Sequence, residues 1–173
     1  MKSSHLCIIL LVLCASCSRK SDKDLYQEGK AAHELQHFDL ALDRYQAVVD
    51  QAPKSAYAES SQYRMAVIYN NDLHDNSKAI QAYQKFCTMF PASDKAPSAL
   101  FLIGFLYNNE LHNSDSARRV YETFLQKYPE HSLAASAKFE LETLGKDPTL
   151  LLQSRVASEG SDKSRKSSNA AKQ

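Results

Sequence analysis

The residues with the most specific chemical pattern lie near the start of the chain, in the stretch AAHELQHFDLA from Ala31 to Ala41. Within it, HELQH matches H-E-x-x-H, in which two histidines one helical turn apart bind zinc and the glutamate activates a water molecule. His33 and His37 would be the zinc ligands, and Glu34 would be the base. One hypothesis is therefore a zinc-dependent hydrolase, and the competing one is a chance match in a helical sequence.

Few other residues suggest chemistry. His74 and His112 are the nearest downstream histidines that could complete a zinc site, but no ligand motif flanks them. Cys87 lies in the helical pattern YQKFCTMF, which predicts a small buried side chain rather than a nucleophile. The sequence has no Gly-rich phosphate loop, no CxxC pair and no Ser/His/Asp constellation. We therefore expect no catalytic residues, no cofactor and no metal.

Residues 1–16 predict a lipoprotein signal peptide. Lys2 precedes the apolar run LCIILLVL at residues 6–13, which is too short to span a bilayer as a helix. The following LCASC resembles a bacterial lipobox, although Cys14 stands where leucine is usual. The resemblance implies that Cys17 is lipidated and becomes the first mature residue; without lipidation the protein would be secreted into the periplasm.

The same resemblance implies a location in the bacterial envelope. Ser18 after the lipidated cysteine favours the outer membrane, at its periplasmic face, and residues 17–23 would form a polar tether.

The overall composition excludes one class of partner and favours one class of fold. Lys and Arg total 21 against 20 Asp and Glu, so the net charge of +1 gives no sign of nucleic-acid binding. Only 4 Gly and 5 Pro occur, which favours an all-α fold.

Many positions of the sequence share a period of 38 residues, which indicates a repeat protein. An alanine, a tyrosine and a proline recur in this way: Ala41, Ala79 and Ala117; Tyr45, Tyr83 and Tyr121; Pro53, Pro91 and Pro129. YNNDLH at residues 69–74 recurs as YNNELH at 107–112. The repeated NNxLH is either a polar recognition element or a loop-packing motif.

Each repeat predicts two helices. APSALFLIGFLYNN is apolar nearly all round, and SARRVYETFLQKYP then places its apolar residues on one helical face. We predict hairpins at residues 24–53, 58–91 and 96–129, and a capping helix at 132–145 that Gly145 ends. Ser77, and Ser114 or Asp115, are placed to cap second helices. The polar segment 146–173 is predicted to be mostly disordered.

The small, aromatic and proline positions of each copy resemble the tetratricopeptide repeat (TPR). The matching residues are Gly29, Ala41, Tyr45 and Pro53; Ala66, Tyr69, Ala79, Tyr83 and Pro91; Gly104, Tyr107, Ala117, Tyr121 and Pro129. The first copy departs from the pattern with Ala32 at its aromatic position. The lengthened period and the P-x-S joints resemble periplasmic outer-membrane proteins of this family, such as the TPR lipoprotein of the barrel-assembly machine and the Tol-Pal-associated coordinator.

The repeat places HELQH at a hairpin turn. His33 falls in the last turn of the first helix, and His37 falls beyond that helix, at the turn before the second. A zinc protease needs both histidines on one continuous helix. The repeat therefore favours the chance match over the zinc site.

The family resemblance also assigns a concave face to the first helices. Carried onto this chain, its peptide-contacting positions are Tyr26, Lys30, His33, Tyr63, Val67, Asn70, Phe101, Phe105 and Asn108, with Phe139 continuing the row. Aromatic rings would supply contact area, and amides would pair with a peptide backbone. In the alternative interpretation, these aromatic residues pack between repeats as core.

These observations favour a membrane-anchored, non-enzymatic scaffold that binds proteins or peptides in the bacterial envelope, with a role in outer-membrane protein assembly. The first alternative is a coordinator of the Tol-Pal system or cell wall. The second, from a different class, is the zinc-dependent hydrolase through HELQH.

Overall fold

The computed structural model describes residues 19–146, which form seven α-helices and two π-helical segments. They are α1 Asp22–Glu34, α2 Phe38–Gln51, α3 Ala56–Val67, η1 Ile68–Asp72, α4 Asn76–Met89, α5 Ala96–Phe105, η2 Leu106–Glu110, α6 Ser114–Lys127 and α7 Ala134–Thr143. The predicted signal peptide, Cys17 and residues 147–173 lie outside the described residues. No helix between residues 19 and 146 combines the length and apolar character needed to cross a membrane.

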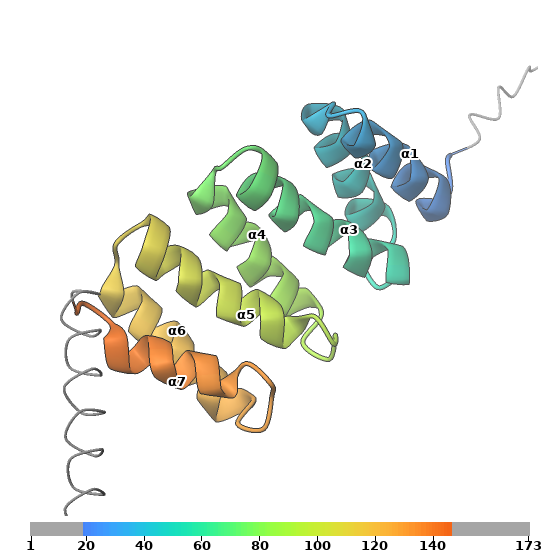
Figure 1. The fold of residues 1–173 in the computed structure, drawn as a ribbon. Helices are drawn as coiled ribbons and strands as arrows, with labels where there is room; N and C mark the ends of the chain where they lie inside the picture. Colours follow the sequence, from blue (N-terminus) through green and yellow to red (C-terminus); the bar gives the residue numbers. More distant parts are fainter. Residues whose placement is uncertain (1–18, 147–173) are drawn as a thin grey trace, which may run out of the picture.

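The helices form three hairpins, α1–α2, α3–α4 and α5–α6, stacked one on the next (Figure 1). The odd-numbered helices line one face of the stack and the even-numbered helices the other. α7 packs against α6, with Ala134, Ala137 and Leu144 buried at that contact, and so covers the third hairpin. The prediction of an all-α stack of three hairpins with a final helix is confirmed.

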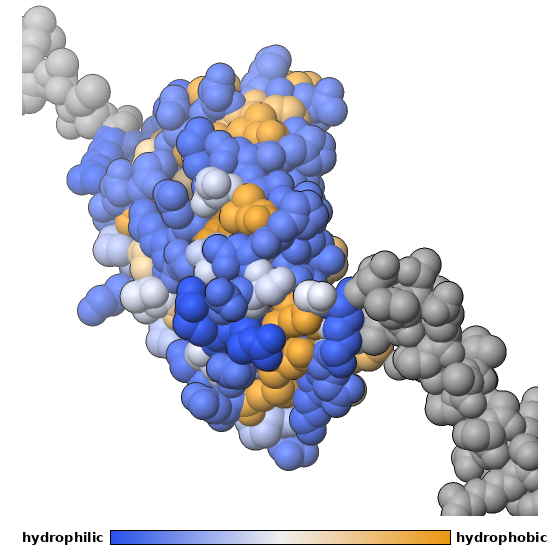
Figure 2. Space-filling view, turned by 90° about the vertical axis from the view of Figure 1, so that its left-hand side faces the viewer, coloured by the Kyte–Doolittle hydropathy of each residue, from blue (hydrophilic) through white to orange (hydrophobic). Residues whose placement is uncertain are grey.

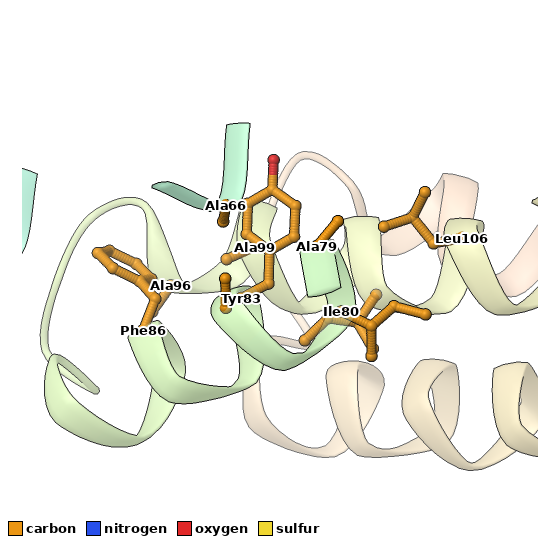
Figure 3. Packing of buried hydrophobic residues seen from close by; sticks show 10 residues of the cluster. Ala66, Ala79, Ile80, Tyr83, Phe86, Ala96, Ala99 and Leu106 are labelled. Atoms are coloured by element: carbon orange, nitrogen blue, oxygen red, sulfur yellow. The ribbon is translucent and has the colours of Figure 1, made fainter. Parts of the chain in front are cut away.

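The recurring alanine and tyrosine form the centre of each hairpin. Tyr83 is 1 % exposed, and Figure 3 shows its ring beside Ala66, Ala79 and Ala99. These alanines let α3, α4 and α5 approach closely, because a larger side chain would fill the space that the ring occupies. Each hairpin repeats this tyrosine, and the three rings are almost completely buried.

The first and second helices of each hairpin are joined by a turn with one left-handed residue. Gln36, His74 and His112 have φ values of 59°, 51° and 49°. In the first hairpin the His37 amide donates to the Ala32 carbonyl, as in a Schellman motif. The second and third hairpins carry one more residue, and the wider turns of η1 and η2 absorb it within the helix.

Polar side chains start several helices. Ser21 and Ser55 cap α1 and α3, and Asp75 and Asn113 cap α4 and α6 through the amides three residues on. The prediction that Ser77, and Ser114 or Asp115, would be the caps was wrong, because the second helices begin earlier than the pattern indicated. Gly145, with φ of 73°, follows the end of α7 as predicted.

Candidate peptide-binding face

HELQH is divided by a turn. α1 ends at Glu34, Gln36 has a positive φ, and His37 is the residue before α2. The prediction that the helix ends between the two histidines is confirmed, so their rings do not share one helical face. His33 Nε2 instead lies 2.9 Å from Asp72 Oδ2 of the second hairpin. The first histidine of the motif therefore links two repeats.

The downstream histidines lie at the other hairpin turns. His74 and His112 are exposed and are the left-handed residues of those turns. No group of three His, Cys, Asp or Glu side chains suited to a metal ion occurs within residues 19–146.

The predicted aromatic row packs largely into the hairpins. Tyr26, Tyr63 and Phe101 each place their ring 5.4–5.8 Å from the buried tyrosine of their own second helix. All three are half-buried. Each ring therefore contributes to the hairpin core on one side and leaves part of its surface on the first-helix face.

Polar contacts join successive first helices across this face. The Arg64 guanidinium donates through Nε to the Tyr26 hydroxyl at 2.9 Å and lies 5.7 Å from the centre of that ring. Asn108 donates through Nδ2 to Glu140 Oε2 at 3.4 Å. Together with His33–Asp72, these contacts fix the register between repeats. The sequence-based prediction missed Arg64, Asp72 and Glu140 as partners, and no motif in the sequence singled them out.

The most exposed side chains of the predicted set are Lys30, Phe105 and Phe139. Phe105 on α5 is 39 % exposed and Phe139 on α7 is 44 % exposed. Lys30 pairs with Glu34 at 3.6 Å. Val67 and Asn70 are half-buried on the second hairpin. The face therefore offers two large aromatic surfaces at its C-terminal end and amides between them and the first hairpin.

Burial leaves the thiol and the central phenols of the stack in their neutral forms. It raises the pKa of the Cys87 thiol to about 11 and that of Tyr45 to about 12, and it raises the pKa of Tyr83 and Tyr121 further. A thiol of this kind is a poor nucleophile at neutral pH. The groups on the first-helix face are suited to holding a segment by ring contacts and hydrogen bonds.

The comparisons with known proteins agree with this geometry. The family model YfiO, described as outer membrane lipoprotein, matches residues 18–147. The N-terminal domain of stress-induced protein-1 (STI-1) from C. elegans is 17 % identical, with a TM-score of 0.58 over 70 % of this chain and 94 % of that one. An Arabidopsis OM64 TPR domain is 16 % identical, with a TM-score of 0.51 over 71 % and 95 %. These likenesses confirm the TPR fold. No curated protein matched.

Proposed function

The chain belongs to the YfiO family of outer membrane lipoproteins, and we propose that it is a lipid-anchored adaptor that binds protein segments in the cell envelope. Its ligand would lie along the face of α1, α3, α5 and α7 as a helical or extended peptide. The adaptor would help to assemble outer-membrane proteins, and it would act without catalysis, cofactor or metal.

The observation that carries this proposal is the exposure of Phe105 and Phe139 on neighbouring first helices. Large aromatic side chains, at 39 % and 44 % exposure, supply contact area at low entropic cost. The Asn108 amide beside them accepts or donates hydrogen bonds through groups that Glu140 leaves available. Tyr63 and Asn70 extend the surface toward the second hairpin, and Tyr26, Lys30 and His33 toward the first.

The anchor is the second part of the proposal. Cys17 stands five residues before the start of α1, so a lipid at its sulfur would hold the stack close to the membrane. The family description, outer membrane lipoprotein, supports the lipid anchor and the outer membrane; the periplasmic face is part of the proposal. Cys17→Ala should move the protein from the membrane fraction to the soluble periplasmic fraction.

The binding face is tested by mild cross-linking and capture of the full chain from its native membrane. We compare the wild type with the double variant Phe105→Ala, Phe139→Ala, and use Glu122→Ala as the control, since Glu122 is exposed but lies on α6, away from the first-helix face. The double variant should lose the captured proteins while keeping the wild-type melting temperature. An unchanged captured set would overturn the assignment of this face.

The identity of the captured proteins separates the two envelope roles. Subunits that assemble outer-membrane barrels would support the proposed role, whereas Tol-Pal or cell-wall proteins would support a coordinator. The zinc hydrolase is not proposed, because the turn at Gln36 separates His33 from His37.

A further inference from the structure

An exposed leucine recurs at the same place in every hairpin turn. Leu35, Leu73 and Leu111 are spaced by 38 residues and are 67 %, 40 % and 41 % exposed. Each directly follows a first helix or its π segment. A single exposed leucine needs no explanation, but three in register along one edge form an apolar strip. These three residues are named the leucine edge.

Leu73 lies at a hollow between the first and second hairpins. Leu73 of the second hairpin joins residues 36–40 of the first in lining a shallow hollow of about 400 Å³. The hairpin turns lie along the left-hand side of Figure 1, and Figure 2 looks onto that side. There, apolar areas follow one another down the stack, framed by hydrophilic surface. An apolar segment in this hollow would contact Leu73 together with Leu40 of α2.

Acidic side chains surround these leucines. The turn segments 34–39, 72–78 and 110–115 carry six carboxylates and one lysine: Glu34, Asp39, Asp72, Asp75, Glu110, Asp115 and Lys78. Three of these carboxylates already have partners: Asp75 pairs with Lys78 at 3.1 Å, Glu34 with Lys30 at 3.6 Å and Asp72 with His33 at 2.9 Å. Asp39, Glu110 and Asp115 form no ion pair among the described residues. A segment that binds here should combine apolar side chains with positive charge.

The described chain leaves the stack beside the third turn. Leu144, directly after α7, is buried in the same cluster as Ala117 of α6, and Asn113 caps that helix two residues after Leu111. In Figure 1, α7 ends next to the α5–α6 turn. Residues 150–152 are three leucines, and four residues of extended chain beyond Lys146 reach about 13 Å. Arg155 follows them with a positive charge.

We propose that the leucine edge is the docking site for residues 150–156 of this same chain, LLLQSRV, which fold back from the end of α7 onto Leu111 and Leu73. The leucines bury one another, and Arg155 faces the acidic border. A second copy is disfavoured because two acidic edges would meet, and an anionic lipid surface would be repelled. The site is separate from the first-helix face and does not depend on the proposed function.

Hydrogen–deuterium exchange of the full chain in detergent tests the proposal. The triple variant Leu150→Ser, Leu151→Ser, Leu152→Ser should speed amide exchange at least threefold in residues 106–116 and 68–76, and leave the buried part of α4 unchanged. Ala170→Ser with Ala171→Ser is the matched control in the same terminal segment, and it should behave as wild type. Unchanged exchange in the triple variant at both turns would overturn the proposal.

A reciprocal variant tests the contact from the other side. Leu111→Ser should speed exchange in residues 147–156, whereas Leu35→Ser, at the far turn, should not. Two outcomes would show that something other than residues 150–156 binds the leucine edge, and either would refute the proposal. Protection of the turns that rises with protein concentration would identify a second copy, and protection seen only after addition of an envelope extract would identify a partner protein.

Discussion

The close approach of the two helices of a hairpin depends on small residues opposite the recurring tyrosine. A Cβ atom added at Gly104 would lie 2.7 Å from Cε1 of Tyr121, and one added at Gly29 would lie 2.8 Å from the same atom of Tyr45. The second hairpin has Ala66 at this position. In each hairpin, the space that the tyrosine ring leaves beside the first helix therefore decides whether glycine or alanine fits there.

Gly104→Val should therefore destabilise the protein. The added methyl groups meet the buried Tyr121 ring, and overpacking of a core costs about 1–3 kcal/mol. Urea denaturation followed by circular dichroism measures the change. Ala135→Val, at an exposed position of α7, is the control and should cost only a few tenths of a kcal/mol. Equal effects of the two substitutions would refute the role of the close approach.

The sequence alone predicts some side-chain positions of this protein and not others. Gly104 and the buried tyrosines were predicted because Ala66 and Gly104, and likewise the tyrosines, are spaced by 38 residues, and periodicity is visible in the sequence. Gly29 was predicted from its match to the small position of the tetratricopeptide pattern. The His33–Asp72 and Asn108–Glu140 contacts were not predicted, because they depend on how far successive hairpins rotate relative to one another. The same rotation decides how much of Tyr26, Tyr63 and Phe101 reaches the surface, so the peptide-binding role of these residues stays a prediction.

At the scale of the element, the hairpin turns are the clearest difference between the repeats. The small residue of the first helix and the alanine of the second are 12 residues apart in the first copy, from Gly29 to Ala41, and 13 apart in the second and third copies. This spacing indicates one extra residue between the helices, but not that it would widen the helix itself. In η1 the Leu73 amide donates to the carbonyl of Ile68, five residues back, and the Asp75 amide donates to Tyr69, six residues back. A π segment keeps Ile68 completely buried while it absorbs the extra residue.

Deletion of Asn71 should be tolerated. Without it, the second turn has the length of the first, which closes as an ordinary Schellman motif at Gln36. We expect the cooperative unfolding transition to remain, with a loss of less than about 2 kcal/mol in free energy of unfolding. Deletion of Gln62, in the middle of α3, should unfold the hairpin, because every later side chain rotates by about 100°. If urea denaturation finds the two deletions equally damaging, the π segment is indispensable.

At the scale of the whole molecule, the stack is stabilised by contacts between neighbouring hairpins, and each hairpin contributes the same kind of core. The three buried tyrosines make this repetition testable through pH. Burial raises the pKa of Tyr45 to about 12, and that of Tyr83 and Tyr121 also rises. The folded protein therefore holds these phenolic protons more tightly than the unfolded chain does, for which the pKa is about 10.

Below pH 10, ionisation of these tyrosines should not affect the free energy of unfolding. As pH rises from about 10 to 12, the free energy of unfolding should fall. In that range the unfolded chain has lost phenolic protons that the folded protein keeps, so ionisation favours unfolding. Urea denaturation at pH 8 and pH 11, with tyrosinate absorbance recorded in parallel, measures the effect. Equal stability at both pH values would contradict the predicted shift.

Tyr121→Phe then isolates one of the three groups. The Tyr121 hydroxyl is buried, and within residues 19–146 it has no hydrogen-bond partner, so its removal leaves no group newly unsatisfied. At pH 7 the variant should be as stable as the wild type or more stable, by up to about 2 kcal/mol, because an unsatisfied buried hydroxyl is destabilising. Its stability should also fall less steeply above pH 10. A loss of stability at pH 7 would mean that this hydroxyl has a partner in solution, and an unchanged alkaline slope would mean that Tyr121 has the same pKa in the folded protein as in the unfolded chain.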